Sequence, residues 1–316
     1  MTWFLSVLLC ILCWSATDLC NKRGSDPEDK GSHLKFLVWL GLVMGALSCL
    51  LLPWSESGLP VLSLIHKYRE YIPFALAYVL ALMFSMIGVR FLDISVISPL
   101  ENIDGAIAGV ILLVYFVATG AIDDLSKQFT WLDPIGFVLI LAGTIFLGMQ
   151  ENQAKKADSQ HKNHRLGAVA FLFPMVYNLF DAASMVFEGV IFQADGGTAV
   201  GEFDFLILEG IAFLVMGVGA WFYLLLGKKT LYCPFRKGEL VKGGAALTEG
   251  LGNVLFALAI AQNPVLTPPV TNTYFLFTIL GAKRILKEKL SRQQYICLFI
   301  LSVGILLLGI SEVLKH

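Results

Sequence analysis

Long apolar stretches separated by short polar connections run through the whole of this 316-residue chain. A helix needs about 20 largely apolar residues to cross the hydrocarbon core of a bilayer. With a window of that size, the sequence predicts ten membrane-spanning helices and an all-α fold. The ten predicted spans are residues 2–20, 35–54, 71–92, 95–119, 131–150, 167–192, 204–227, 239–262, 264–283 and 293–313.

Two polar connections are typical of solvated loops, residues 22–35 and residues 151–165. The second connection divides the chain almost in half. We therefore expect a first five-helix unit over residues 1–150, a linker loop over 151–166, and a second five-helix unit over 167–316.

The two halves resemble one another along the chain, which is a pattern common among transporters. Three pairs of segments correspond in the same order: residues 135–148 with 296–309, residues 98–102 with 268–272, and Trp14 and Asp18 with Tyr177 and Asp181. Because five helices is an odd number, the second copy must enter the membrane from the opposite side. The sequence therefore predicts two inverted five-helix repeats.

Together, these features resemble the drug/metabolite transporter superfamily, and within it the ten-helix EamA-type transporters, over essentially the whole chain. The local marks are Trp14-Ser15, the proline-bearing starts of the fourth and ninth predicted helices, and the run from Phe275 to Ser291. The chain departs from the usual pattern around Ala121-Ile122-Asp123-Asp124 and by placing Asp18 in its first helix. The resemblance implies transport and leaves the substrate open.

The composition indicates whether the chain folds in water or in a lipid bilayer. Residues of the AVILMFWYC set make up 57% of the chain and charged residues only 15%, with a mean hydropathy of +0.74. A soluble exterior cannot hold that much apolar surface, so the sequence predicts an integral membrane protein. The net charge of −1 provides no basic field for nucleic acid. Cys10 and Cys13 lie inside an apolar run, where small packing residues are the simpler interpretation than a redox or metal motif.

The basic residues predict an orientation in the cell membrane. The odd-numbered loops and adjoining helix ends carry 17 Lys and Arg residues, against 4 in the even-numbered loops and the C-terminal tail. Positive residues concentrate on the cytoplasmic side. The count therefore places the odd-numbered loops inside and both termini outside, whereas many members of the resembled family have both termini inside.

Ionisable residues within the predicted spans are costly and are usually functional. The candidates among them are seven acids and one base: Asp18, Glu101, Asp104, Asp181, Glu188, Glu209, Glu249 and Arg90. Asp181 and Glu188 are seven residues apart and share one helix face. Glu101 and Asp104 follow Pro99, and broken helix starts commonly line a cavity. Asp18 and Glu209 lie nearer their helix ends.

The functional interpretation is a central cavity with acidic, protonatable walls that attracts a cationic solute or carries protons. The alternative is structural, since Arg90 can pair with Asp93 or Glu101 and the terminal acids can face water. Aromatic rings at matching positions can stack on a substrate or hold a cation, or can simply pack. The candidates for substrate binding or proton coupling are Glu101, Asp104, Asp181, Glu188, Glu249, Trp14, Tyr177, Tyr274, Asn102 and Asn272, and the candidate helix breaks are Pro99, Pro268 and Pro269.

The leading hypothesis is a secondary transporter that moves a small metabolite or drug-like solute by alternating access. No G-x-x-x-x-G-K-[ST] motif for ATP occurs, and the sequence gives no sign of a cofactor or metal site. A flippase-like lipid carrier or an accessory membrane subunit is the alternative, because the resembled superfamily includes lipid carriers. A membrane enzyme acting on lipid-linked substrates is less favoured, since the chain offers the adjacent acidic pair Asp123-Asp124 but no histidine in a predicted helix.

Overall fold

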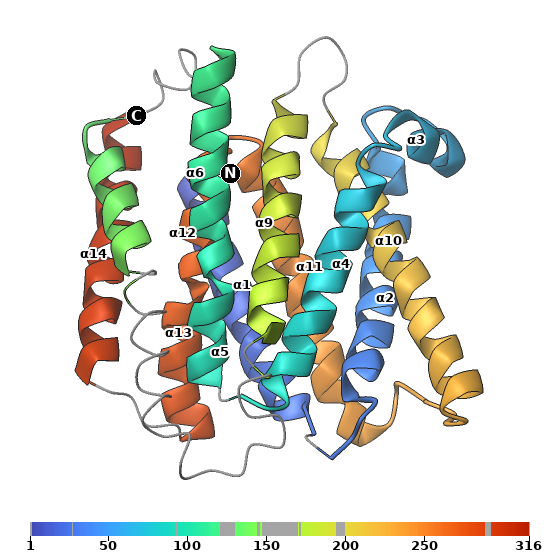
Figure 1. The fold of residues 1–316 in the computed structure, drawn as a ribbon. Coiled ribbons are helices and arrows are strands. Elements are labelled where there is room, and N and C mark those ends of the chain that lie inside the picture. The colour runs from blue at the N-terminus through green and yellow to red at the C-terminus, as the bar shows by residue number, and fades with distance from the viewer. Residues whose placement is uncertain are drawn as a thin grey trace.

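The computed structural model of the chain is a bundle of helices (Figure 1). It describes residues 2–26, 28–92, 94–120, 130–143, 146, 170, 172–193, 200–287 and 292–315, and these residues form no strand. The long helices are α1 (Trp3–Gly24), α2 (Ser32–Leu51), α4 (Ile72–Val89), α6 (Ile103–Thr119), α9 (Leu172–Phe192), α10 (Glu202–Phe222), α11 (Leu240–Ile260) and α14 (Arg292–Lys315).

Seven helices of the described part are long and apolar enough to cross a membrane. Two further apolar helices, Leu132–Gly143 and Tyr295–Ser311, are shorter. The chain is thus an all-helical membrane protein with several spanning helices, while the count of ten stays a prediction. The seven spans are Trp3–Gly24, Ser32–Trp54, Ile72–Val89, Ile97–Thr119, Leu172–Phe192, Glu202–Gly227 and Lys237–Ile260.

Short helical segments complete the description. One of them, α3, covers an exposed turn that hydropathy alone did not predict, because seven residues are too few to give a span. The short segments are η1 (Leu52–Trp54), α3 (Val61–Lys67), α5 (Ile94–Glu101), η3 (Tyr223–Gly227), η4 (Lys237–Glu239), α12 (Thr267–Thr271), η5 (Asn272–Tyr274), α13 (Phe275–Gly281) and η6 (Ala282–Leu286).

Two predicted spans are broken rather than continuous. In the first, Pro99 lies inside α5, and the helix is interrupted three residues later at Asn102 before α6 begins. In the second, Pro268 and Pro269 occupy the first turn of α12, where a missing N–H costs little, and the irregular turn follows at η5. The two breaks place polar backbone and side chains deep in the bundle.

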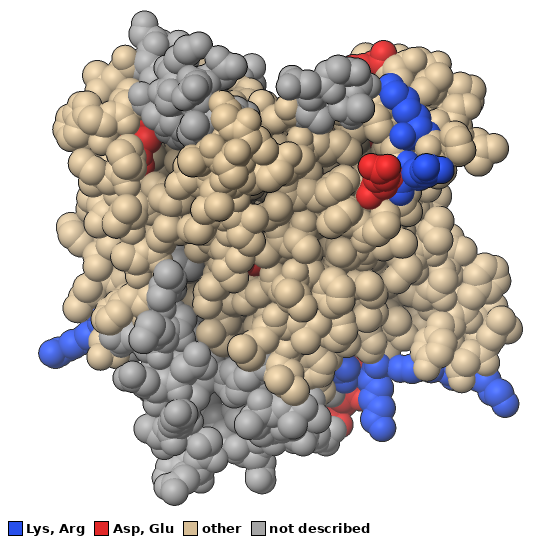
Figure 2. Space-filling model, turned by 45° about the horizontal axis from the view of Figure 1, so that its top comes forward, with Lys and Arg blue, Asp and Glu red and all other residues tan. Residues whose placement is uncertain are grey.

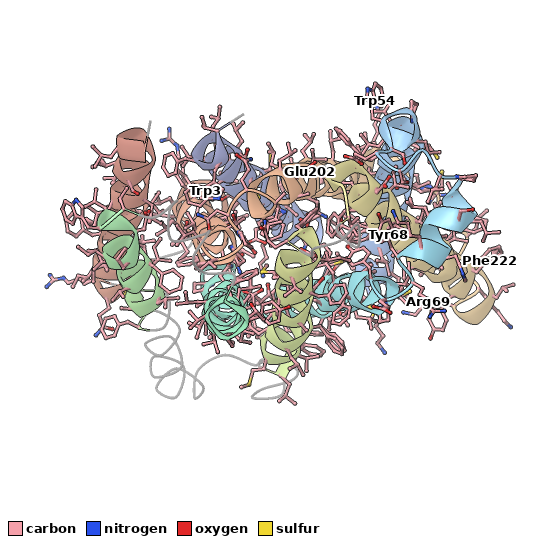
Figure 3. The ribbon with its side chains drawn as sticks, turned by 90° about the horizontal axis from the view of Figure 1, so that it is seen from above. Trp3, Trp54, Tyr68, Arg69, Glu202 and Phe222 are labelled. Atoms are coloured by element: carbon pink, nitrogen blue, oxygen red, sulfur yellow. The ribbon has the colours of Figure 1, made fainter. Side chains whose placement is uncertain are left out.

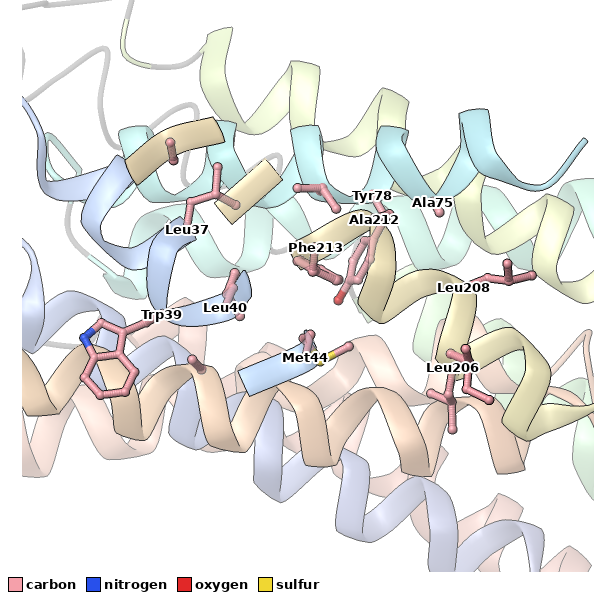
Figure 4. Close-up of a cluster of buried hydrophobic side chains, with 14 of the residues drawn as sticks. Leu37, Trp39, Leu40, Met44, Ala75, Tyr78, Leu206, Leu208, Ala212 and Phe213 are labelled. Carbon is pink, nitrogen blue, oxygen red and sulfur yellow. The ribbon is translucent and has the colours of Figure 1, made fainter. Parts of the chain in front are cut away.

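Glycines allow α2 and α10 to approach closely. A Cβ atom built on Gly41 would lie 2.8 Å from the Cα of Gly217, and one on Gly217 would lie 2.7 Å from the Cα of Gly41. Contacts that close leave no room for a side chain between the two backbones. The apolar core beside this pair includes Phe213 of α10 and Tyr78 of α4, which meet edge to face (Figure 4).

Four other pairs of elements pack closely. Helix α1 packs on α11, α4 on α9, α6 on α12, and Leu132–Gly143 on α14. In the last pair, Gly136 and Gly304 lie against the facing backbone. Viewed from above, α14 and α10 lie toward opposite ends of an elongated bundle (Figure 3).

The direction of each helix follows from Figure 1. Helices α1, α4 and α10 run downward in that view, whereas α2, α6, α9 and α11 run upward. The connections α1–α2 and α10–α11, the end of α13 and the start of α14 therefore lie at the lower end, away from α3. On the face visible in Figure 2, Lys and Arg lie near the two ends and the middle is almost entirely uncharged. Such an uncharged belt suits contact with hydrocarbon.

Candidate functional site

A small chamber lies between helices from both halves of the chain. The space is about 40 Å³, whereas ligand pockets usually measure about 300–1,000 Å³. It therefore has room for water molecules, and a metabolite requires the helices to move apart. The lining residues are Trp14, Thr17, Asp18, Asn21, Phe36, Tyr78, Leu82, Ser85, Met86, Tyr177, Asp181, Met185, Glu188, Phe205, Glu209, Glu249, Asn253, Phe256, Asn272 and Tyr274.

Carboxyl groups dominate the chamber and the layer directly behind it. The seven buried acids are between 0 and 8% exposed: Asp18, Glu101, Asp104, Asp181, Glu188, Glu209 and Glu249. Among the described residues, no Lys or Arg lines the chamber. Each acid with a described hydrogen bond receives it from a neutral donor, as Glu101 does from Ser85 Oγ (2.9 Å). The protein therefore leaves the negative charge of any ionised acid in this group uncompensated by a cation.

Glu249 lies at the centre of a polar network that crosses the chamber. The hydroxyl of Tyr78 donates to Glu249 Oε1 at 2.5 Å and lies 3.1 Å from Asn253 Oδ1. Asn253 also accepts from Trp14 Nε1 (3.3 Å) and donates to Glu209 Oε1 (3.3 Å). One amide thus joins side chains from four helices, α1, α4, α10 and α11.

A second network lies at the two helix breaks. Asp104 Oδ1 accepts from Asn272 Nδ2 (2.5 Å) and from the Gly105 N–H (2.8 Å). Asn178 of α9 accepts from the Asp104 N–H (3.2 Å) and donates to the Leu100 carbonyl (2.7 Å). These bonds satisfy backbone groups that the interruption between α5 and α6 releases. The breaks of both halves therefore meet one another and α9 at Asp104.

Several buried oxygens around these networks have no hydrogen-bond donor from another residue. Buried acceptors are normally satisfied, so a group of unsatisfied ones indicates a ligand, water or a proton. They are Glu101 Oε1, Asn102 Oδ1, Asp104 Oδ2, Asp181 Oδ1, Glu209 Oε2 and Asn272 Oδ1.

The structure brings most of the sequence candidates together. Asp181, Glu188, Glu249, Trp14, Tyr177, Tyr274 and Asn272 line the chamber. Glu101, Asp104 and Asn102 are buried at the first helix break, behind the lining. Asp18 and Glu209, given less weight because they lie nearer helix ends, also line it. Arg90 is elsewhere, since its Nε donates to the Asp26 carbonyl beyond the end of α1.

Sequence reasoning missed Tyr78, Ser85 and Asn253. Asn253 carried a usable signal, because it lies one turn after Glu249 on the same helix face. Tyr78 and Ser85 share a face of α4 in the same way, but an uncharged hydroxyl in an apolar helix is too common to single out.

Charged residues hold the lower end of the bundle together. Lys35 of α2 lies 2.8 Å from Asp29 and 3.9 Å from Glu239, and Lys242 lies 2.7 Å from Glu239. Partial burial raises the pKa of Asp29, but hydrogen bonds from Lys35 and the Gly31 N–H outweigh it, and the net effect lowers this pKa. Burial, followed by the nearby Glu239 charge, raises the pKa of Tyr232. These ion pairs join the loop after α1, the first turn of α2 and the start of α11.

A separate apolar groove of about 680 Å³ lies between α6 and α9. Its wall includes Ile107, Leu179 and Ala183, and Asn178 is its one amide. Ala182 lines this groove while the adjacent Asp181 lines the chamber, so α9 separates the two spaces.

Among the described residues, no cluster of three or more His, Cys, Asp and Glu is arranged to hold a metal ion. The Asp123-Asp124 pair and the linker over 151–166 lie outside the described residues. The six cysteines form no disulfide with one another, and Cys10 and Cys297 are buried.

No family model matches the chain, and no curated protein matches it. A solved structure described as "Crystal structure of protein" is similar to it, with a TM-score of 0.62 over 99% of each chain and 11% sequence identity. At that identity the likeness concerns the fold alone.

Proposed function

We propose that this chain is a secondary transporter that moves a small organic solute across the cell membrane by alternating access. The observation that carries the proposal is the chamber, where unpaired buried acids and unsatisfied acceptor oxygens face one another between the two halves. A solute with N–H or O–H donors, and above all an organic cation, supplies what these groups lack. The rings of Trp14 and Tyr274 favour the same class.

The packing of the helices supports the inverted repeat of the proposal. The contacts α2–α10, α6–α12 and Leu132–Gly143 with α14 each join equivalent helices of the two predicted halves. When each helix is replaced by its equivalent in the other half, the contact α1–α11 becomes the contact α9–α4. Equivalent helices such as α1 and α9 run in opposite directions (Figure 1). A chamber between two inverted halves suits rocking of one half against the other.

The small volume of the chamber and the basic lower end of the bundle fit this mechanism. Since about 40 Å³ admits no metabolite, the structure is best interpreted as an occluded state between inward and outward openings. The sequence contains no P-loop, so we propose that a solute or proton gradient drives transport. The lower, Lys- and Arg-rich end is proposed to face the cytoplasm.

The test is a thermal-stability screen of the detergent-purified protein against cationic, zwitterionic and anionic metabolites, because a ligand that binds the folded state raises its apparent stability. We expect amines or quaternary ammonium compounds to stabilise the protein, and Glu249→Gln to remove the effect. Glu70→Gln, which changes an exposed acid on the loop before α4, is the matched control. Hits confined to anions, or hits that Glu249→Gln leaves intact, would contradict the proposal.

The apolar groove between α6 and α9 favours a second candidate, a carrier of lipids or other amphiphiles. A lipid tail can occupy this groove, and its head group would reach the polar chamber only if α9 moved aside and the chamber widened. Ala183 is exposed on the groove wall, so Ala183→Trp fills the groove without disturbing the chamber. Transbilayer movement of a fluorescent phospholipid that this variant blocks would favour the lipid carrier. Unchanged small-solute binding by the variant, with no lipid movement by the wild type, would favour the first candidate.

A further inference from the structure

Two buried carboxyl groups from different halves of the chain face one another at the helix breaks. Asp104 is in the first turn of α6 and is 0% exposed, and Asp181 is near the middle of α9 and is 1% exposed. Their side chains are within hydrogen-bonding reach of each other. The pair therefore lies on the contact between α6 and α9.

The other hydrogen bonds of the pair use only one oxygen of each carboxyl. Asp104 Oδ1 is held by Asn272 and Gly105, and Asp181 Oδ2 accepts from the Tyr177 hydroxyl at 2.8 Å. Asp104 Oδ2 and Asp181 Oδ1 have no donor from another residue. An ionised carboxylate only accepts hydrogen bonds, so two carboxylates cannot bond to one another. One proton between the free oxygens satisfies both.

We propose that Asp104 and Asp181 form a carboxyl pair that holds a single exchangeable proton between the two halves of the bundle. The reaction is the release of this proton to water, which leaves two carboxylates, and its return restores the hydrogen bond. Without the proton, two negative charges oppose each other where little water screens them. The proton thus ties α6 to α9, and its release separates them.

The groups around the pair are acidic or neutral. Glu101 of α5 adds negative charge beside both members of the pair, and Glu188, Glu209 and Glu249 do so beside Asp181 when they are ionised. Tyr177 and Asn178 of α9 and Asn272 and Tyr274 of η5 complete the surroundings. In the described part of the chain, no Lys or Arg lines the adjoining chamber and takes the place of the proton.

The contact between the two helix breaks connects the Asp104–Asp181 pair to residues that line the chamber. A Cβ atom on Gly105 would lie 2.5 Å from the Pro268 carbonyl and 2.6 Å from the Asn272 amide, so α6 and the second break touch without a gap. A change in the separation of α6 and α9 must therefore displace η5, which carries the chamber residues Asn272 and Tyr274. Resting on the proposed function, this displacement makes the pair the coupling site for protons.

The experiment is infrared difference spectroscopy of the full-length protein in liposomes, titrated with pH without solute. We expect a carbonyl band of a protonated carboxyl that disappears as pH rises. Either Asp104→Asn or Asp181→Asn should remove it, because the new amide can donate to the remaining carboxylate. The double variant should lose no more signal than either single variant, since the proton belongs to the pair.

Asp133→Asn is the control, because Asp133 is a buried acid that bonds to Ser311 at the far end of the bundle. It should leave the band and its pH dependence intact. A band retained by both single variants, or lost additively in two halves, would overturn the shared proton. If both single variants fail to fold, Asp181→Glu provides the test, because it keeps the carboxyl group. This variant should show the band, with a shifted midpoint in the pH titration. No band in that folded variant overturns the pair.

Solute flux separates this inference from the proposed function. Flux with unchanged pH dependence in the Asp104→Asn variant rejects the coupling role and leaves transport standing. A pair band without any solute binding or flux rejects the transporter and leaves the shared proton standing.

Discussion

The close contact of α2 and α10 gives the sharpest prediction about stability. Gly217 and Gly219 lie two residues apart on α10, and both can be changed to Ala. A Cβ atom at Gly217 would lie 2.7 Å from the Cα of Gly41 and 2.9 Å from the Leu37 carbonyl, whereas one at Gly219 would meet nothing within 4 Å. The two substitutions therefore share the same change in helix propensity and differ in the clash.

The magnitudes follow from these contacts. Gly to Ala in a helix interior is worth about 0.8–1 kcal/mol in intrinsic propensity, and this term cancels between the two variants. The atoms opposing Gly217 belong to the backbone and cannot rotate away, so α2 and α10 must separate. Forcing an extra methyl group into a packed interface costs about 1–3 kcal/mol. We therefore expect Gly217→Ala to be about 1–3 kcal/mol less stable than Gly219→Ala.

The assay is the apparent Tm of both variants, purified in the same detergent and heated at one rate. By the scaling of soluble domains of roughly 150–250 residues, about 1 kcal/mol corresponds to roughly 2–4 °C. Equal Tm values for the two variants, or a higher value for Gly217→Ala, would refute the close backbone contact. Gly41→Ala should reproduce the loss from the other side of the interface.

Three further predictions concern the chamber and its lower end. A double-mutant cycle of Tyr78→Phe with Glu249→Gln, measured by apparent stability, should give a coupling energy of about 1.5–3 kcal/mol if Glu249 is ionised, because the 2.5 Å hydrogen bond is then charge-assisted. A coupling energy near zero would contradict this contact. The pKa of Asp29 is lowered in the folded chain, so its ion pair with Lys35 stabilises the fold at pH values above the unfolded pKa of about 3.9, and this stabilisation is lost as pH falls further. The Tm difference between wild type and Asp29→Asn should therefore be constant near neutral pH and shrink below about pH 4. A Tm difference that persists below that pH would contradict the prediction. Gly105→Leu should abolish solute binding measured by thermal shift, because its side chain would push the second break away from α6, and unchanged binding would show that the breaks move independently.

Much of the fold could be predicted from hydropathy, because a spanning helix must present about 20 apolar residues to lipid wherever it lies in the bundle. The spans 71–92 and 239–262 agree with α4 and α11 to within a few residues. The break near Pro99 was expected, but its position at Asn102 depends on bonds from Asn178, a residue more than 70 positions away. The sequence does not reveal such a partner.

Hydropathy was enough to place the acids Asp181 and Glu249 in the middle of apolar helices, where a charge is costly at any rotation and must avoid lipid. Which acids share a space depends on the packing of the helices and could not be predicted from the sequence. Asp18 and Glu209 line the chamber because of how α1 and α10 pack in the bundle, whereas Arg90 lies outside it and donates to the Asp26 carbonyl. Hydropathy records how far along a helix a residue lies, but the partner that its side chain meets depends on how helices distant in sequence pack together.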